Sequence, residues 1–99
     1  MDISTEIRNV IETGKANMGF RSARKDAMRG EAKLMIISSN APKDLKEEIE
    51  HICKKANIPI KEVSLDSLEL GSVCKRPFPV SFLSIVDPGE SKIIKASEE

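Results

Sequence analysis

Hydrophobic residues near the N-terminus recur at the spacing of one helical face, at Ile3, Ile7, Val10 and Ile11. This spacing predicts an amphipathic helix that ends at Gly14. A second, shorter helix is predicted from Ser22, whose hydroxyl can cap the first turn, to a stop at Gly30. The residues expected to face inward on this second helix are Ala23, Ala27 and Met28.

The pattern then changes to a continuous apolar run at residues 34–37, which is typical of a strand buried on both faces. After a turn at residues 40–42, a helical stripe extends over residues 44–57. A short strand is predicted at residues 58–63, with Pro59 near its start, where a missing N–H matters least. The helical stripe consists of Leu45, Ile49, Ile52, Cys53 and Ala56.

The C-terminal part of the chain predicts one more helix and two more strands. The helix covers residues 66–73, and a buried strand follows at residues 80–86. A tight turn at residues 87–90 leads into a predicted antiparallel edge strand at residues 91–95. The residues expected to pack the short helix against the core are Leu65 and Leu68.

Strands that alternate with helices need crossover connections, and these connections place helices on both faces of a sheet. We therefore predict an α/β fold, namely a three-layer α/β/α sandwich with a small mixed four-stranded sheet. The 99 residues form one domain, residues 1–99. Hydrophobic residues make up 39% and charged residues 32%, a balance that excludes a disordered chain.

The charges exclude one class of function and leave another open. Lys and Arg number 16 and Asp and Glu number 16, so a polycation that coats nucleic acid through bulk charge is excluded, but a local basic patch is not. No apolar run approaches the ~20 residues of a membrane span, and the first residues do not resemble a signal peptide. We therefore expect no membrane partner and a cytoplasmic location, where Cys53 and Cys74 are reduced, partly buried thiols.

The sequence offers little support for catalysis. The single histidine, His51, lies on the polar side of its predicted helix and is expected to be a solvated surface residue. His51 and Cys53 are two positions apart, so on a helix they point in different directions and form no metal pair. No nucleotide-binding glycine motif or nucleophile elbow occurs. We expect no enzyme activity, cofactor, metal or small-molecule substrate.

Basic residues gather in one part of the chain, between residues 15 and 33, where only Asp26 and Glu31 oppose them. The residues from Gly14 to Gly19 are expected to form a connection into the helix capped by Ser22, whose N-terminus suits a phosphate. On this evidence alone, a solvated basic helix and a nucleic-acid surface are about equally supported. The six basic residues are Lys15, Arg21, Arg24, Lys25, Arg29 and Lys33.

An aromatic residue in a basic loop favours the nucleic-acid interpretation. Phe78 lies between Pro77 and Pro79 and follows Lys75 and Arg76, so it is expected to stack on an unpaired base. The alternative is that Phe78 only caps the end of the sheet. Gly71 would either let a ligand approach the backbone closely or end a helix. Phe20 could also stack on a base, but it is expected to pack inward.

Several segments together resemble the ribosomal protein L-thirty-e family of archaea and eukaryotes, over residues 3–95. The similarity lies in GKANMGFRS at 14–22, GEAKLMIISSNAP at 30–42, IPI at 58–60, LG at 70–71, RP at 76–77 and IVDPGES at 85–91. The resemblance implies an α/β/α sandwich that binds kink-turn or related internal-loop RNA. It also implies that Phe78 is the loop aromatic that stacks on RNA.

The wider superfamily includes the L-seven-Ae branch, in which an Asn-Glu pair reads bases within Gly-Thr-Asn-Glu-x-x-Lys. The matching positions here begin at Gly19 and end at Lys25, and Arg21 and Ser22 stand in place of the pair. This difference favours the L-thirty-e branch and a large-subunit ribosomal protein. The alternatives are a kink-turn component of a non-ribosomal particle, or a protein-binding regulator on the same fold. The basic cluster disfavours the regulator.

We therefore predict a single RNA site made by three loops at one end of the sandwich, namely residues 14–22, the start of the helix at 66–73 near Gly71, and residues 75–80. Backbone N–H groups with Lys15, Arg21 and Lys25 are expected to hold phosphates, while Asn17 and Asn40 contact bases or sugars. The expected partners are ribosomal RNA and neighbouring proteins of the large subunit. The full set of predicted RNA-binding residues is Gly14, Lys15, Asn17, Gly19, Arg21, Ser22, Lys25, Asn40, Gly71, Lys75, Arg76 and Phe78.

Overall fold

The computed structural model describes residues 3–94 and shows four helices and four strands within that range. In chain order they are α1 (Ile3–Thr13), β1 (Lys15–Met18), α2 (Phe20–Met28), β2 (Leu34–Ile37), α3 (Lys43–Lys55), β3 (Ile60–Glu62), α4 (Ser67–Val73) and β4 (Phe82–Asp87). No described helix is long and apolar enough to cross a membrane.

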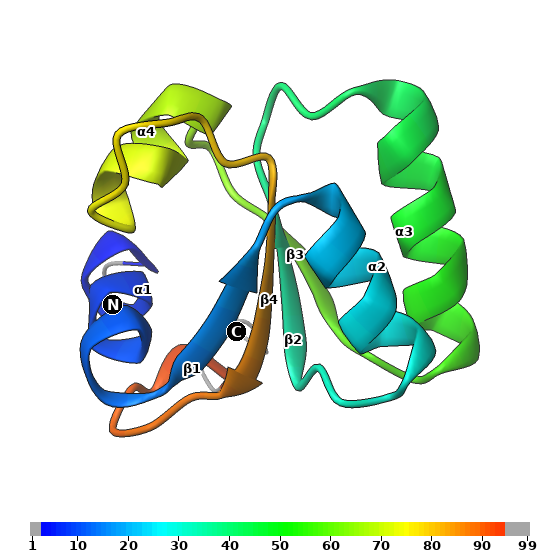
Figure 1. Cartoon of the computed structure of the whole chain (residues 1–99), viewed down its shortest axis with the longest axis horizontal. Helices are drawn as coiled ribbons and strands as arrows, with labels where there is room; N and C mark the ends of the chain where they lie inside the picture. The colour runs from blue at the N-terminus through cyan, green and yellow to red at the C-terminus, as the bar shows by residue number, and fades with distance from the viewer. Residues whose placement is uncertain (1–2, 95–99) are drawn as a thin grey trace.

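The four strands form one mixed sheet in the order β1-β4-β2-β3. Strand β4 pairs antiparallel with β1 on one side and with β2 on the other, and β2 pairs parallel with β3. Figure 1 shows α1 and α4 on one face of this sheet and α2 and α3 on the other. The predicted α/β/α sandwich with a mixed four-stranded sheet is thus confirmed.

Each face of the sheet has its own hydrophobic core, and β2 contributes to both. Leu34 and Ile36 pack in the cluster under α1 and α4, whereas Met35 and Ile37 pack in the cluster under α2 and α3. All four side chains are completely buried. This placement explains the continuous apolar run, because alternate side chains of a strand point to opposite faces.

The prediction of the edge strand was wrong. Residues 15–18, expected to be part of a connection, form the edge strand β1, whereas Ile93 and Ile94 are helical and Lys95 lies outside the described residues. The carboxylate of Glu6 accepts hydrogen bonds from the Lys92 backbone N–H at 2.7 Å and the Ser91 hydroxyl at 3.0 Å. These bonds hold the segment against α1 rather than beside the sheet.

Two further local predictions were wrong. Helix α2 begins at Phe20 with Gly19 before it, and Ser22 is an exposed residue of its first turn that makes no cap. Met28 and Leu68, expected to face inward, are 61% and 68% exposed. Both helices are short, so Ala23 and Ala27 in α2 and Leu70 and Val73 in α4 already fill the faces that contact the sheet.

The remaining elements lie within two residues of their predicted bounds. Helix α3 begins at Lys43, and α4 begins after Asp66, whose side chain forms a capping box with Glu69. Strand β3 is shorter than predicted at both ends, and β4 begins two residues later and ends one residue later than predicted.

Candidate nucleic-acid interface

Three chain segments meet at one end of the sheet, the upper end in Figure 1. The Gly19 N–H donates to the Phe82 carbonyl at 2.9 Å, which joins the β1–α2 junction to the start of β4. The Ser38 N–H donates to the Ser81 carbonyl at 2.9 Å, which joins the β2–α3 turn to the same place. We call this surface, made by residues 19–22, 38–42 and 75–81, the loop end.

The loop end does not contain every residue predicted for it. Strand β1 crosses the sheet, so Gly14 and Lys15 lie at the opposite end from Gly19. Gly14 packs against the backbone of the turn after β4, and Lys15 is in register with Asp87. The prediction that residues 14–22 form one loop at one end was therefore wrong.

The loop from Lys75 to Val80 is fixed by α4. The Arg76 N–H donates to the Gly71 carbonyl and the Val80 N–H to the Ser67 carbonyl, both at 2.9 Å. Gly71 is buried inside α4, and a Cβ added there would lie 2.1 Å from the Phe78 carbonyl oxygen. Gly71 lies within α4 and does not end the helix, and its missing Cβ lets the loop backbone pack closely on α4.

Phe78 is half exposed on this fixed loop, at 50% of its surface. In contrast, Phe20 is partly buried and contacts Phe82 edge-to-face, with ring centroids 5.6 Å apart. Phe20 is therefore part of the core of the α2–α3 face, as expected. Of the three phenylalanines, Phe78 alone offers a large exposed area, which is the requirement for stacking on an unpaired base.

The basic side chains at the loop end differ in whether they form an ion pair within the protein. Lys75, which has a positive φ of 59°, places Nζ 2.6 Å from Glu12 Oε1 of α1. This exposed hydrogen bond and the lysine charge lower the pKa of Glu12. An exposed ion pair contributes only ~0–1 kcal/mol to stability, so Lys75 can leave the Glu12 carboxylate and bind a phosphate instead. Arg21 and Arg76 are exposed and form no ion pair among residues 3–94.

Asn40 connects two segments of the loop end. Its Oδ1 accepts from the Ser67 N–H at 2.8 Å and from the Ser38 hydroxyl at 3.1 Å, and its Nδ2 donates to the Ser67 hydroxyl at 3.4 Å. The side chain thus holds the β2–α3 turn against the start of α4. This contact joins residues 27 positions apart, so the sequence pattern could not reveal it.

A separate polar concavity of about 280 Å³ runs along the open edge of β1 and the outer side of α2. We call it the edge groove. Lys15, Lys25 and Arg29 supply its positive charge, and none of them forms an ion pair within the described part of the chain. Its other lining residues are Asn17, Ser22, Asp26 and Glu31.

Two residues of the edge groove, Asn17 and Arg29, differ from what the sequence predicted for the site. Asn17 Nδ2 donates to Asp26 Oδ2 at 2.7 Å, so this amide is already engaged inside the protein. Arg29, which was not among the predicted site residues, lies beside Lys25 one helical turn further on. The i, i+4 spacing of these two cations was the signal that could have identified it.

No group of residues in the described range is arranged to hold a metal ion. Cys53 and Cys74 are free, buried thiols, as predicted, and burial is the main cause that raises the pKa of each to about 11. Thiols protonated to this extent are poor nucleophiles and poor ligands at neutral pH.

Comparison with known proteins gives full-length matches. A sequence model of the family described as "Ribosomal protein L7Ae/L30e/S12e/Gadd45 family" matches residues 1–95. A protein from Methanocaldococcus jannaschii named "Large ribosomal subunit protein eL30" is 40% identical, over 100% of this chain and 90% of its own. The protein of the same name from Pyrobaculum islandicum is 41% identical, over 99% and 97%.

A solved structure supports the fold alone. It is described as a protein with unknown function from Bacillus halodurans C, and it superposes with a TM-score of 0.85 over 99% of this chain and 98% of its own. Its sequence is 21% identical, so the similarity concerns the arrangement of helices and strands and not the chemistry of a site.

Proposed function

The chain belongs to the ribosomal protein L7Ae/L30e/S12e/Gadd45 family, and from this premise we propose that it is an RNA-binding protein of the large ribosomal subunit. The support is similarity at about 40% identity, over nearly the whole chain, to archaeal proteins that carry the large-subunit name. These relatives are named as ribosomal proteins and not as enzymes. The proposed place of action is the ribosome in the cytoplasm.

The RNA we propose is a kink-turn or related internal loop of ribosomal RNA. Internal loops expose unstacked bases, and proteins recognise them by stacking aromatic rings on those bases. The single observation that carries this proposal is Phe78, half exposed on a loop that Gly71 and two prolines hold in place. A fixed ring loses little conformational freedom when a base stacks on it.

The backbone at the start of α2 also suits RNA. Gly19 has a φ of +100°, which L side chains rarely adopt, and a Cβ added there meets no atom within 4 Å. The space before the helix is therefore open to a sugar or phosphate. The first N–H groups of α2 and the exposed guanidinium of Arg21 would face this space as phosphate donors.

We further propose that the edge groove extends the phosphate contacts away from the loop end. Lys25 and Arg29 from α2 and Lys15 from β1 would each contact RNA backbone. Backbone contacts of this kind fix position and orientation, whereas the loop end selects the unpaired bases. Because Asn17 is engaged with Asp26, we assign Asn17 to the support of the groove and not to base recognition.

The test is binding of an internal-loop ribosomal RNA fragment by Phe78 variants, measured by fluorescence anisotropy at constant salt. Stacking is worth ~1–3 kcal/mol per base, so Phe78→Ala should weaken binding by roughly tenfold or more. Phe78→Tyr should keep most of the affinity because the ring face remains, and Phe78→Leu should not. Because the ring is half exposed, the melting temperature of each variant should change little.

The matched control is Met28→Ala, which removes another exposed apolar side chain at the far end of α2. It should leave RNA affinity unchanged. If Phe78→Ala lowers the melting temperature sharply while the folded protein binds RNA normally, the ring is a packing residue and the stacking proposal is wrong.

A further inference from the structure

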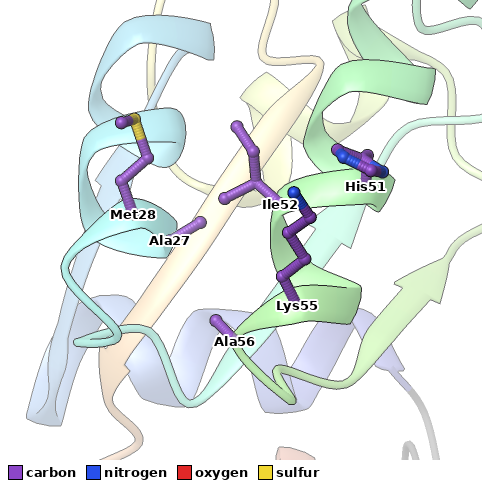
Figure 2. A pocket seen from close by; sticks show the side chains of 6 residues that line it. All are labelled: Ala27, Met28, His51, Ile52, Lys55 and Ala56. Carbon is purple, nitrogen blue, oxygen red and sulfur yellow. The ribbon is translucent and has the colours of Figure 1, made fainter.

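A second concave surface lies on the α2–α3 face, between the C-terminal parts of these helices and away from the loop end. It encloses about 410 Å³. Figure 2 shows Ala27 and Met28 extending from α2, opposite Ile52, Lys55 and Ala56 of α3. We call this surface the helix groove. Its lining residues are Ala27, Met28, His51, Ile52, Lys55 and Ala56.

The floor of the helix groove is apolar. Ala27 is completely buried, and Ile52 and Ala56 are partly buried against the core of this face. Met28 forms one wall and is 61% exposed. A methionine side chain is flexible and polarisable, so it can adapt its shape to an aliphatic side chain placed beside it.

One positive side chain at the helix groove has no oppositely charged partner. Arg24 of α2 and Glu48 of α3 form an ion pair with Nε and Oε1 3.5 Å apart, so these two charges neutralise each other. Lys55 lines the helix groove and forms no ion pair with any residue from 3 to 94. An occupant that brings a carboxylate beside Lys55 would complete this surface.

These features favour protein over RNA as the occupant. The one aromatic ring in the lining, the His51 imidazole, lies farther from α2 than Ile52 and Lys55 do (Figure 2), and the floor between the helices offers aliphatic carbon instead of hydrogen-bond donors. A single lysine would contribute one phosphate contact, whereas an aliphatic side chain could bury its surface against Ile52 and Ala56 beside Met28. Apolar contacts beside a complementary charge are typical of protein–protein contacts.

We propose that the helix groove binds a short segment of another protein, one that carries aliphatic side chains with a carboxylate next to them. The aliphatic side chains cover Ile52 and Ala56 beside Met28, and the carboxylate pairs with Lys55. This role goes beyond RNA binding. Helix α2 has the loop end at its N-terminus and the helix groove at its C-terminus, so the protein would hold RNA and a neighbouring protein at the same time.

The probe for this proposal is a synthetic helical peptide with Leu and Glu at i, i+4 spacing, titrated into the isotope-labelled protein and followed by NMR. We expect saturable shifts at the methyl groups of Ala27, Ile52 and Ala56. A peptide with Lys in place of each Glu should bind about fivefold more weakly or worse, because it places like charge beside Lys55. The RNA fragment should bind equally well with and without the acidic peptide.

Two variants on α3 supply the matched comparison. Lys55→Glu should weaken acidic-peptide binding at least fivefold and improve binding of the basic peptide. Lys54→Glu makes the same charge change one residue away, outside the groove lining, and should have little effect. Both lysines are exposed, so neither change should alter the fold.

Four results would overturn the proposal, and all but the third are independent of whether the protein binds ribosomal RNA. They are no saturable shift in the helix groove, equal binding of the acidic and basic peptides, displacement of the peptide by RNA, and methyl shifts that grow with protein concentration alone. The third would make the surface an RNA site, and the fourth would make it a contact between copies of this chain.

Discussion

Two buried carboxylates connect segments that are distant in the sequence. Asp26 Oδ2 accepts from Asn17 Nδ2 at 2.7 Å and from the Ser84 hydroxyl at 2.5 Å, which joins α2 to β1 and β4. Glu6 joins α1 to the segment after β4. Asp26 therefore holds the residues of the edge groove together, and Glu6 holds the segment after β4 against α1.

The pH dependence of stability should reveal the contribution of Glu6. The Lys92 N–H is the main cause that lowers the pKa of Glu6 from its ordinary value of 4.5, and burial opposes it. A pKa lower in the folded than in the unfolded state stabilises the fold above pH 4.5, and this stability is lost as pH falls through the folded value.

The measurement is urea unfolding of the wild type and Glu6→Gln across this range. The variant should be less stable at neutral pH, and the difference should shrink below pH 4.5. Glu47→Gln, which changes an exposed carboxylate on α3 that forms no ion pair among residues 3–94, is the comparison for general effects of charge. A stability difference independent of pH would mean that the charge of Glu6 has no part in holding the segment.

At the scale of elements, the strands and helices whose residues are deeply buried were the ones that the sequence predicted well. Strand β2 was predictable because a run of four apolar residues admits few other structures. Strand β1 was not, because its four residues KANM carry no strand signal and it pairs with β4 alone at the edge. Residues 93 and 94 suggested a strand through their two isoleucines, but they are helical and follow Ser91 and Lys92, which hydrogen bonds to Glu6 hold against α1.

The candidate site was predictable to a similar extent. The proline-flanked Phe78 was recognisable because local sequence fixes its loop, and its exposure agrees with the role expected for it. The internal hydrogen bonds of Asn17 and Asn40 could not be predicted, because their partners Asp26 and Ser67 meet them only through the fold. The close packing of Gly71 against the Phe78 carbonyl could not be predicted for the same reason.

Gly71→Ala should test whether α4 positions the Phe78 loop. The added Cβ would lie 2.1 Å from the Phe78 carbonyl, so the loop backbone must shift. Overpacking of this kind costs ~1–3 kcal/mol. We expect lower stability in urea unfolding together with weaker RNA binding by the protein that remains folded. Ser72→Ala, at the next and exposed position of α4, should change neither. Normal RNA affinity of folded Gly71→Ala would show that the loop position does not matter.

At the scale of the whole molecule, a formal net charge of zero conceals separate surfaces. Cations line the edge groove and the loop end, whereas Glu47, Glu48 and Glu50 lie on α3. A polyanion would approach from the β1–α2 side and be repelled by α3. The helix groove lies between these regions, with its own lysine, on a part of the surface that the proposed RNA contacts leave uncovered.

The salt dependence of RNA binding should report this charge separation. If about five phosphates are neutralised, log K should fall with log salt at a slope of about −3.5 to −4.5. Arg21→Ala at the loop end and Lys25→Ala in the edge groove should each flatten the slope by roughly one unit. Glu47→Gln on α3 should leave affinity equal or slightly higher. Unchanged slopes for both cation variants would place the RNA elsewhere.

The most direct test of the central claim is an amide-resolved NMR titration of the labelled protein with an internal-loop ribosomal RNA fragment. The account predicts that shifts concentrate at residues 19–22, 38–42 and 75–81, and continue to Lys15, Lys25 and Arg29 in the edge groove. The amides of α3 from Glu47 to Lys55 should stay unchanged. Shifts centred on α3, or an equal response to a fully paired RNA duplex, would contradict recognition of an RNA internal loop by the loop end.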